Sequence, residues 1–133
     1  MVEEWRPYPK NTDYQVSNLG QVKSKYNKIL KQCEGRGGYF AVNIHFADGK
    51  HTKAYVHRMV LETFQPIENS EKMLVDHING KIVDNSLENL RWATPRENVV
   101  YRIENRAEIN QEIIRLTNKY GYEKTLEILQ NIE

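Results

Sequence analysis

The sequence predicts a small α+β protein: an N-terminal antiparallel β-sheet, then a strand–loop–strand–helix unit, then C-terminal helices. Residues 39–56 alternate between apolar and polar side chains around a turn at 47–49, as a β-hairpin does. The period then changes, and residues 56–64 place apolar side chains on one helical face. Residues 74–100 hold two short apolar runs followed by a strong helix start. Strands followed by helices, rather than strictly alternating with them, are typical of the α+β class.

Length and composition indicate a single domain with small appendages. The chain has 133 residues, of which 39% are hydrophobic and 28% charged, as in proteins with a modest core. No run approaches the roughly 20 apolar residues of a membrane span, and the N-terminus lacks the apolar segment of a signal peptide. Cys33 is the single cysteine, which excludes an intramolecular disulfide and a cysteine-rich zinc knuckle. We expect a cytoplasmic protein without a membrane partner.

The net charge of +1 does not by itself indicate a nucleic-acid-binding protein, but the charge is unevenly distributed. Residues 1–58 carry ten Lys and Arg against five Asp and Glu, whereas residues 59–133 carry nine against thirteen. This asymmetry suggests an N-terminal half that faces phosphates; a solvated strand face is the alternative. Most of the basic excess lies in Lys23, Lys25, Lys28, Lys31 and Arg36.

Turn residues divide the chain ahead of the hairpin. Residues 1–19 are rich in Pro, Asn and Asp, so we expect them to form mainly turns. Between these turns and the hairpin, the sequence predicts strands over 14–17, 21–24 and 28–32, and a flexible connection over 35–38.

The unit at residues 74–100 gathers polar side chains. An apolar run brings Asp76 and His77 to the edge of a polar loop, which opens with an Asn-Gly turn at 79–80. Residues 90–93 alternate like a half-buried strand. A Thr-Pro-Arg-Glu sequence at 94–97 then supplies an N-cap, a proline at the first helical position and a capping-box glutamate.

These side chains suit metal-assisted hydrolysis of a phosphodiester. A hard divalent cation prefers oxygen ligands, which Asp76 and Asn98 can provide. A neutral imidazole such as His77 can take a proton from the attacking water, and Asn89 is placed to orient it. A lone histidine after a strand is more often structural, but its Asp neighbour and the two asparagines favour the catalytic interpretation. Asn79 and Asn85 are interpreted as turn residues.

At these positions the chain resembles the HNH nucleases with a ββα-metal site, in particular phage and intron-encoded homing endonucleases. The helix over 56–66 also fits, because such a helix commonly precedes the site. The matching residues are Val75-Asp76-His77-Ile78-Asn79-Gly80, Asp84-Asn85, Glu88-Asn89-Leu90-Arg91-Trp92, Thr94 and Glu97-Asn98.

The resemblance implies roles for four of these residues. In the family, the position of His77 is the general base and that of Asn89 helps to orient it. The positions of Asp76 and Asn98 bind the catalytic metal, usually Mg²⁺, with Mn²⁺ as the alternative. Arg91 and Arg96 could reach the scissile phosphate, although a surface salt bridge is an equal alternative for each.

A second resemblance lies at the N-terminus. Trp5-Arg6-Pro7 and the run from Asp13 to Ser24 look like the nuclease-associated modular DNA-binding motif that precedes such HNH domains. In that family the following sheet lies against double-stranded DNA, which suits the basic residues 23–36. Outward-facing Asn43 and His45 of the hairpin could then reach base edges, while phosphate contacts position the duplex.

Together these features predict three regions and one activity. We expect a β-rich DNA-binding region over 1–54, an HNH nuclease core over 55–105 and a helical segment over 106–133. In the last region, helices are predicted over 107–120 and 122–132; its acidic balance favours packing or a homodimer over DNA contact. The predicted function is a metal-dependent endonuclease of double-stranded DNA in a bacterial or phage-infected cell. The alternatives are a regulator that binds DNA without cutting it and a nuclease acting on structured RNA.

Overall fold

The computed structural model describes residues 2–104 and 115–130, and it confirms the α+β class. Within these residues the strands form two three-stranded antiparallel sheets, β1-β2-β3 and β4-β5-β6, and a two-stranded sheet, β7-β8. The strands are β1 (Trp5–Pro7), β2 (Gln15–Ser17), β3 (Val22–Lys23), β4 (Cys33–Glu34), β5 (Phe40–His45), β6 (His51–Tyr55), β7 (Leu74–His77) and β8 (Leu90–Ala93). The α-helices with defined bounds are α1 (Val56–Phe64), α2 (Pro95–Glu104) and α4 (Tyr122–Gln130), and short 3₁₀ turns are η1 (Arg36–Gly38), η2 (Ser70–Lys72) and η3 (Leu87–Asn89).

The N-terminal half differs from the single predicted sheet in two places. The predicted strand over 28–32 is wrong: only Ile29 bridges to Lys23, and the chain then crosses to the second sheet as β4. Strand β1 was not predicted, because it is three residues long and ends in Pro7. It lies at the edge of its sheet, where a residue without a backbone N–H is tolerated.

The predicted hairpin and the helix after it are confirmed. Strands β5 and β6 pair from Ala41↔Tyr55 to His45↔His51, and the turn closes with the Phe46 N–H donating to the Lys50 carbonyl. Helix α1 starts immediately after β6. It buries one face completely: Val56, Met59, Val60 and Leu61 have no exposed surface.

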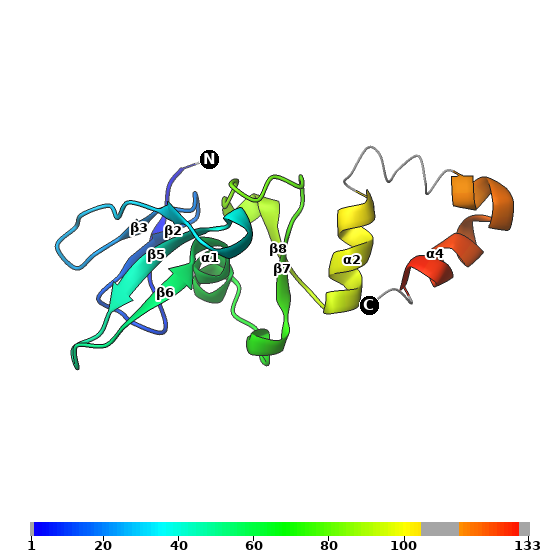
Figure 1. Cartoon of the computed structure of the whole chain (residues 1–133). Helices are drawn as coiled ribbons and strands as arrows, with labels where there is room; N and C mark the ends of the chain where they lie inside the picture. Colours follow the sequence, from blue (N-terminus) through cyan, green and yellow to red (C-terminus); the bar gives the residue numbers. More distant parts are fainter. Residues whose placement is uncertain (1, 105–114, 131–133) are drawn as a thin grey trace.

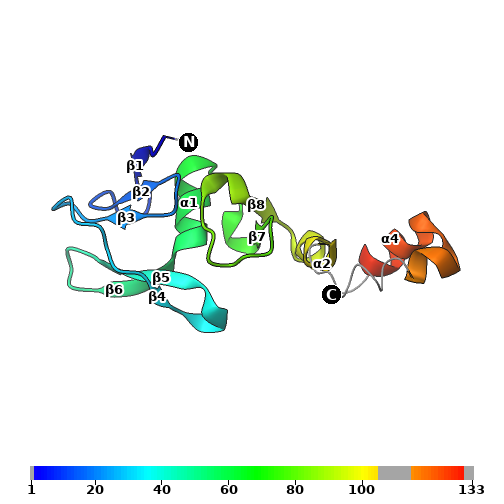
Figure 2. The same ribbon diagram turned by 90° about the horizontal axis from the view of Figure 1, so that it is seen from above.

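Helix α1 is the centre of the hydrophobic core. It contacts β1 and β2 of the first sheet, β5 and β6 of the second, and β8. Figures 1 and 2 show it between the N-terminal sheets and the β7–β8 pair, with α2 on the far side of that pair. Because one helix packs against all three sheets, the core crosses the predicted boundary at residues 54–55.

The C-terminal helices lie farther along the chain, beyond α2 (Figure 1). Residues 115–120 are helical, Gly121 adopts φ +84°, and α4 follows, which agrees with the predicted break between the helices over 107–120 and 122–132. The first part of the predicted 107–120 helix falls outside the described residues. Among the described residues, no helix is both long and apolar enough to cross a membrane. The homodimer through this segment stays a prediction.

Candidate active site

The β7–β8 pair places two of the predicted site residues at the end of one strand. Asp76 faces Arg91 across the pair and His77 faces Leu90. Asp76 and His77 are 4% and 5% exposed. Both line a pocket of about 470 Å³, and Asn98 of α2 lines the same pocket. The structure therefore brings together Asp76, His77 and Asn98, as the sequence predicted.

The partner of the His77 imidazole is Asn85, and the prediction that Asn89 contacts it is wrong. His77 Nε2 lies 2.8 Å from Asn85 Oδ1. Since a carboxamide oxygen only accepts hydrogen bonds, Nε2 carries the proton in the neutral ring and Nδ1 keeps its lone pair. Asn85 is 5% exposed, so it is also more than the turn residue that the sequence suggested.

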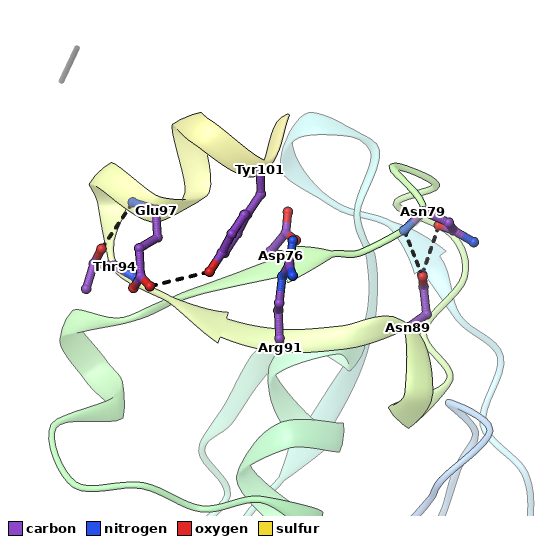
Figure 3. Close-up of polar contacts among 7 residues, drawn as sticks. All are labelled: Asp76, Asn79, Asn89, Arg91, Thr94, Glu97 and Tyr101. Carbon is purple, nitrogen blue, oxygen red and sulfur yellow. Dashed lines mark hydrogen bonds and ion pairs between the residues drawn. The ribbon is translucent and has the colours of Figure 1, made fainter. Parts of the chain in front are cut away.

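Asn89 instead holds the two ends of the loop between β7 and β8 together. Its Oδ1 accepts from the Asn79 backbone N–H at 2.9 Å, and its Nδ2 donates to Asn79 Oδ1 and to the Asp84 carbonyl. Figure 3 shows Asn89 pointing towards Asn79 across the loop. Asn89 ends the 3₁₀ turn η3 directly before β8, which aims its side chain at the start of the loop rather than at the imidazole.

An aromatic cluster lies beside the imidazole. The rings of Tyr39 and His57 have their centroids 6.0 Å and 5.4 Å from that of His77, and Tyr55 is 5.8 Å from His57. Burial, then the nearby His77 and Arg58, lowers the pKa of His57 to about 3. His57 is therefore neutral at physiological pH. It packs among these rings in the first turn of α1.

The predicted capping box positions α2. The Thr94 hydroxyl accepts from the Glu97 backbone N–H at 3.1 Å, and Glu97 Oε1 accepts from the Thr94 N–H at 3.0 Å. The Thr94 backbone N–H first, and then the Thr94 hydroxyl, hold the pKa of the Glu97 carboxyl below its usual range. The helix start is thereby held against the end of β8, and Asn98 of this helix lines the same pocket as Asp76.

Arg91 of β8 contacts the predicted metal ligand. Its Nε lies 2.9 Å from Asp76 Oδ2. Its guanidinium carbon lies 3.4 Å from the centroid of the Tyr101 ring on α2. Figure 3 shows the Tyr101 ring and the Asp76–Arg91 pair side by side at the sheet surface. Arg91 therefore forms a salt bridge, but with a buried carboxylate rather than at the surface, and its contact with the scissile phosphate stays a prediction.

The donor set fits a hard divalent cation. Asp76 and Asn98 offer one carboxylate and one carboxamide to a single pocket, and both are oxygen donors. No group of three or more His, Cys, Asp and Glu that could hold a metal occurs within residues 2–104 and 115–130. Asp76 and Asn98 are therefore the described residues of this pocket that could hold a divalent cation through oxygen atoms.

The residues predicted to bind DNA lie on several elements. Asn43 and His45 face outward on β5, as their alternation predicted. Lys23 lies on β3 with its ammonium 4.2 Å from the Trp5 ring centroid. The remaining members of the basic group, Lys25, Lys28, Lys31 and Arg36, are exposed on the chain from β3 to η1, and Arg96 is exposed in the first turn of α2. Their DNA contacts stay predictions.

Sequence reasoning missed the roles of Asn85, Arg91 and Tyr101 within the site. Asn85 carried a signal, since it belongs to the Asp84-Asn85 pair of the matching motif. Arg91 could have been assigned once Asp76 was placed opposite it, but the register of a pair joined by a long loop is not fixed by turn type. Tyr101 carried no signal beyond its position one helical turn after Glu97 and Asn98.

Comparison with known proteins agrees with this geometry. The model of the HNH endonuclease family matches residues 54–100, and that of the NUMOD4 motif matches residues 3–45. Two uncharacterized HNH endonucleases of Acanthamoeba polyphaga mimivirus are 41% identical over 107 residues and 33% over 105. Each match covers 77% of this chain, but only 27% and 31% of the viral proteins.

A phage enzyme resembles the chain over most of its length. DNA endonuclease I-HmuI of Bacillus phage SP01 is 37% identical over 112 residues, which cover 80% of this chain and 62% of the phage protein. The solved structure described as DNA binding and cleavage by the HNH homing endonuclease I-HmuI superposes with a TM-score of 0.67 and 33% identity, over 86% of this chain and 68% of that one.

Fold and site thus define a protein of the ββα-metal class. More particularly, this chain belongs to the HNH endonuclease family and carries an N-terminal NUMOD4 motif.

Proposed function

We propose that this chain is a metal-dependent homing-type endonuclease that hydrolyses phosphodiester bonds of double-stranded DNA in a bacterial or phage-infected cell. One observation carries the proposal: an oriented imidazole shares a pocket with two oxygen ligands. The imidazole of His77 is oriented by its hydrogen bond of 2.8 Å with Asn85. Asp76 and Asn98 are the two oxygen ligands in the same pocket. The similarity to I-HmuI, whose structure is described as DNA binding and cleavage, supports the choice of substrate.

His77 acts as the general base in this mechanism. Its Nδ1 takes a proton from water as the water oxygen attacks the phosphorus atom. The bond from phosphorus to the 3′ oxygen breaks, leaving a 5′-phosphate and a 3′-hydroxyl. Asn85 keeps Nε2 protonated through the hydrogen bond, so the ring cannot present the wrong nitrogen to the water.

Asp76 and Asn98 would hold the divalent metal, with Mg²⁺ the first candidate and Mn²⁺ the second. When bound, the cation stabilises the negative charge that develops on the leaving 3′ oxygen. The two ligands come from different elements, Asp76 from β7 and Asn98 from α2, so the contact between these elements sets their separation.

The N-terminal half delivers the duplex. Lys23, Lys25, Lys28, Lys31 and Arg36 contact phosphates, and Asn43 and His45 approach base edges. Because the chain supplies one HNH site, one binding event nicks one strand. A homodimer through the C-terminal helices would be needed for a double-strand break in a single event.

The proposal is tested by incubating the purified chain with supercoiled plasmid and with phage genomic DNA, in Mg²⁺ or in EDTA. We expect nicked product only in Mg²⁺, with 5′-phosphate ends that a ligase can reseal. Sequencing the junctions gives the target site. DNA binding that weakens with salt but yields no product in any divalent metal would favour the regulator instead. A structured RNA is also added in competition with the DNA. If the protein cuts DNA preferentially, the interpretation as a nuclease of structured RNA is excluded.

A further inference from the structure

The carboxylate of Asp76 already has a cationic partner in the protein. Asp76 and Arg91 face each other in the register of β7 and β8, so their pairing is built into the sheet. The Arg91 Nε to Asp76 Oδ2 distance is 2.9 Å, with side-chain exposures of 36% for Arg91 and 4% for Asp76. A carboxylate this buried is stable as an anion only when a positive charge or hydrogen bonds compensate it.

A second contact holds Arg91 in place. The Tyr101 ring lies 3.4 Å from the guanidinium carbon, and the Tyr101 hydroxyl donates to Glu97 Oε2 at 3.4 Å. Figure 3 shows Glu97, Tyr101, Arg91 and Asp76 in sequence from α2 to the sheet. Stacking on an aromatic face suits the flat, weakly hydrated guanidinium and fixes its plane.

Arg91 retains binding capacity for an anion. The ion pair with Asp76 uses Nε, and none of the described residues accepts a hydrogen bond from the terminal nitrogens of Arg91. These nitrogens belong to the more exposed partner of the pair. A guanidinium binds phosphate through two parallel N–H donors, so the free end of Arg91 suits a DNA phosphodiester.

A dication that binds Asp76 must overcome the charge of Arg91. Two cations on one buried carboxylate repel each other, and the guanidinium also weakens the carboxylate as a ligand. A phosphodiester that accepts the guanidinium removes this repulsion and adds its own negative charge to the pocket. The two binding events therefore favour each other.

We propose that Arg91 is an exchangeable counter-cation of Asp76: it neutralises the carboxylate in the free protein and passes to a DNA phosphate when DNA binds, so that metal and DNA bind with positive coupling. The inference rests on the proposed function, because it takes Asp76 as a metal ligand and DNA as the substrate. Reciprocity requires that the metal strengthens DNA binding by the same factor by which DNA strengthens metal binding.

The first test measures the Mn²⁺ affinity of the free protein, by the electron paramagnetic resonance signal of unbound Mn²⁺. All variants carry His77→Ala, so that DNA cleavage is suppressed during the binding measurements. Adding Arg91→Met should tighten Mn²⁺ binding on the order of tenfold, because the competing charge is gone. Lys81→Met is the matched control: Lys81 lines the same pocket without pairing with Asp76, and its removal should change the affinity much less.

Tyr101 provides a test that removes no charge. Tyr101→Leu frees the guanidinium from its stack and should tighten Mn²⁺ binding in the same direction as Arg91→Met, by less. Tyr101→Phe keeps the ring and should behave like the parent. If Arg91→Met does not fold, the comparison of Tyr101→Leu with Tyr101→Phe tests whether Arg91 competes with the metal for Asp76.

The second test measures the coupling, as the affinity for a fluorescently labelled mixed-sequence duplex with and without Mn²⁺ at constant ionic strength. In the parent protein, Mn²⁺ should strengthen DNA binding. In Arg91→Met, the ratio of the DNA affinities with and without Mn²⁺ should fall towards one. Unchanged or weaker Mn²⁺ binding in Arg91→Met, or an unchanged coupling factor, overturns the inference. The proposed function fails separately, if wild-type protein cuts no DNA in Mg²⁺.

Discussion

At the scale of single residues, the site depends on which side chain holds the His77 imidazole. Asn85 and Asn89 lie four residues apart in one loop, and both are buried carboxamides. In the structure Asn85 hydrogen-bonds to the His77 imidazole, whereas Asn89 hydrogen-bonds to both ends of the loop. The two residues should therefore fail in different ways when they are changed.

Asn85→Ala should lower the single-turnover cleavage rate about 10- to 100-fold, the loss typical when the partner that orients a functional imidazole is removed. Asn85→Asp, which keeps an acceptor for Nε2–H, should recover part of that rate. Asn89→Ala should instead lower the free energy of unfolding by about 1–3 kcal/mol, because it leaves buried polar groups unpaired. Rates measured well below the melting temperature separate the two effects. A larger rate loss for Asn89→Ala than for Asn85→Ala would contradict the assignment.

His57 makes a prediction about pH. Its pKa in the folded protein is about 3, below the usual 6.5, so the unfolded chain takes up the proton first on acidification. The contribution of neutral, buried His57 to the free energy of unfolding is complete above about pH 6.5. As the pH falls from there to about 3, the free energy of unfolding decreases by at most about 1.4 kcal/mol per pH unit.

Denaturant titrations across this range measure the effect, with His57→Phe as the comparison. Phe keeps the ring packed near Tyr39, Tyr55 and His77, but it cannot take up a proton. The His57→Phe protein should therefore lose less stability than wild type as the pH falls from 6.5. Identical pH dependences in the two proteins would show that His57 does not titrate as assigned.

Single residues also show where sequence reasoning ends. Residue type and order indicated that Asp76, His77 and Asn98 share a site, because a strand end and a capped helix can be recognised by pattern. The choice between Asn85 and Asn89 could not be made in this way. A loop has no periodicity, so spacing does not tell which of two asparagines turns towards the imidazole.

At the scale of elements, α2 is the part of the site that depends most on its local sequence. It carries Asn98 and Tyr101, and it starts at the Thr94–Glu97 capping box. Thr94→Ala should lower the free energy of unfolding by about 1 kcal/mol, because the Glu97 N–H loses its acceptor. Thermal or denaturant unfolding measures this loss.

Thr94→Ser is the control, since a serine hydroxyl can accept the same hydrogen bond and should retain most of the stability. Equal losses for Ala and Ser would mean that the hydroxyl does not act as the cap.

The pattern of elements was largely predictable, because the hairpin, α1, β7, β8 and α2 all carry strong local signals. Strands β1 and β4 were missed because two or three residues give no detectable alternation.

At the scale of the whole molecule, the two matched motifs share one structure. The Leu87 N–H donates to the Asn18 carbonyl at 2.8 Å, which links the N-terminal motif to the loop of the site. Gly20 adopts φ +85°, and a Cβ there would lie 2.8 Å from the Asn85 carbonyl oxygen. The turn at Gly20 therefore packs directly on the residue that holds His77. No local pattern in the sequence could reveal this contact.

Gly20→Ala should lower both stability and cleavage rate, because the added Cβ pushes on the Asn85 backbone and the left-handed conformation strains it. Gly49→Ala is the matched control. Gly49 has φ +87° but open space around its missing Cβ, so it should lose about 1–2 kcal/mol of stability and keep the rate. Unfolding and single-turnover measurements on both variants separate strain from contact. Equal effects on rate would show that the Gly20–Asn85 contact does not matter to the site.

The central claim is that His77 is the general base of a DNA-cutting site. The most direct test compares single-turnover cleavage of phage DNA in Mg²⁺ by wild type, His77→Ala and Glu71→Ala, an exposed residue of η2 outside the site. His77→Ala should lose about 10²- to 10⁴-fold in rate while binding DNA with unchanged affinity, and Glu71→Ala should cut like wild type. Cleavage by His77→Ala at the wild-type rate would contradict the account.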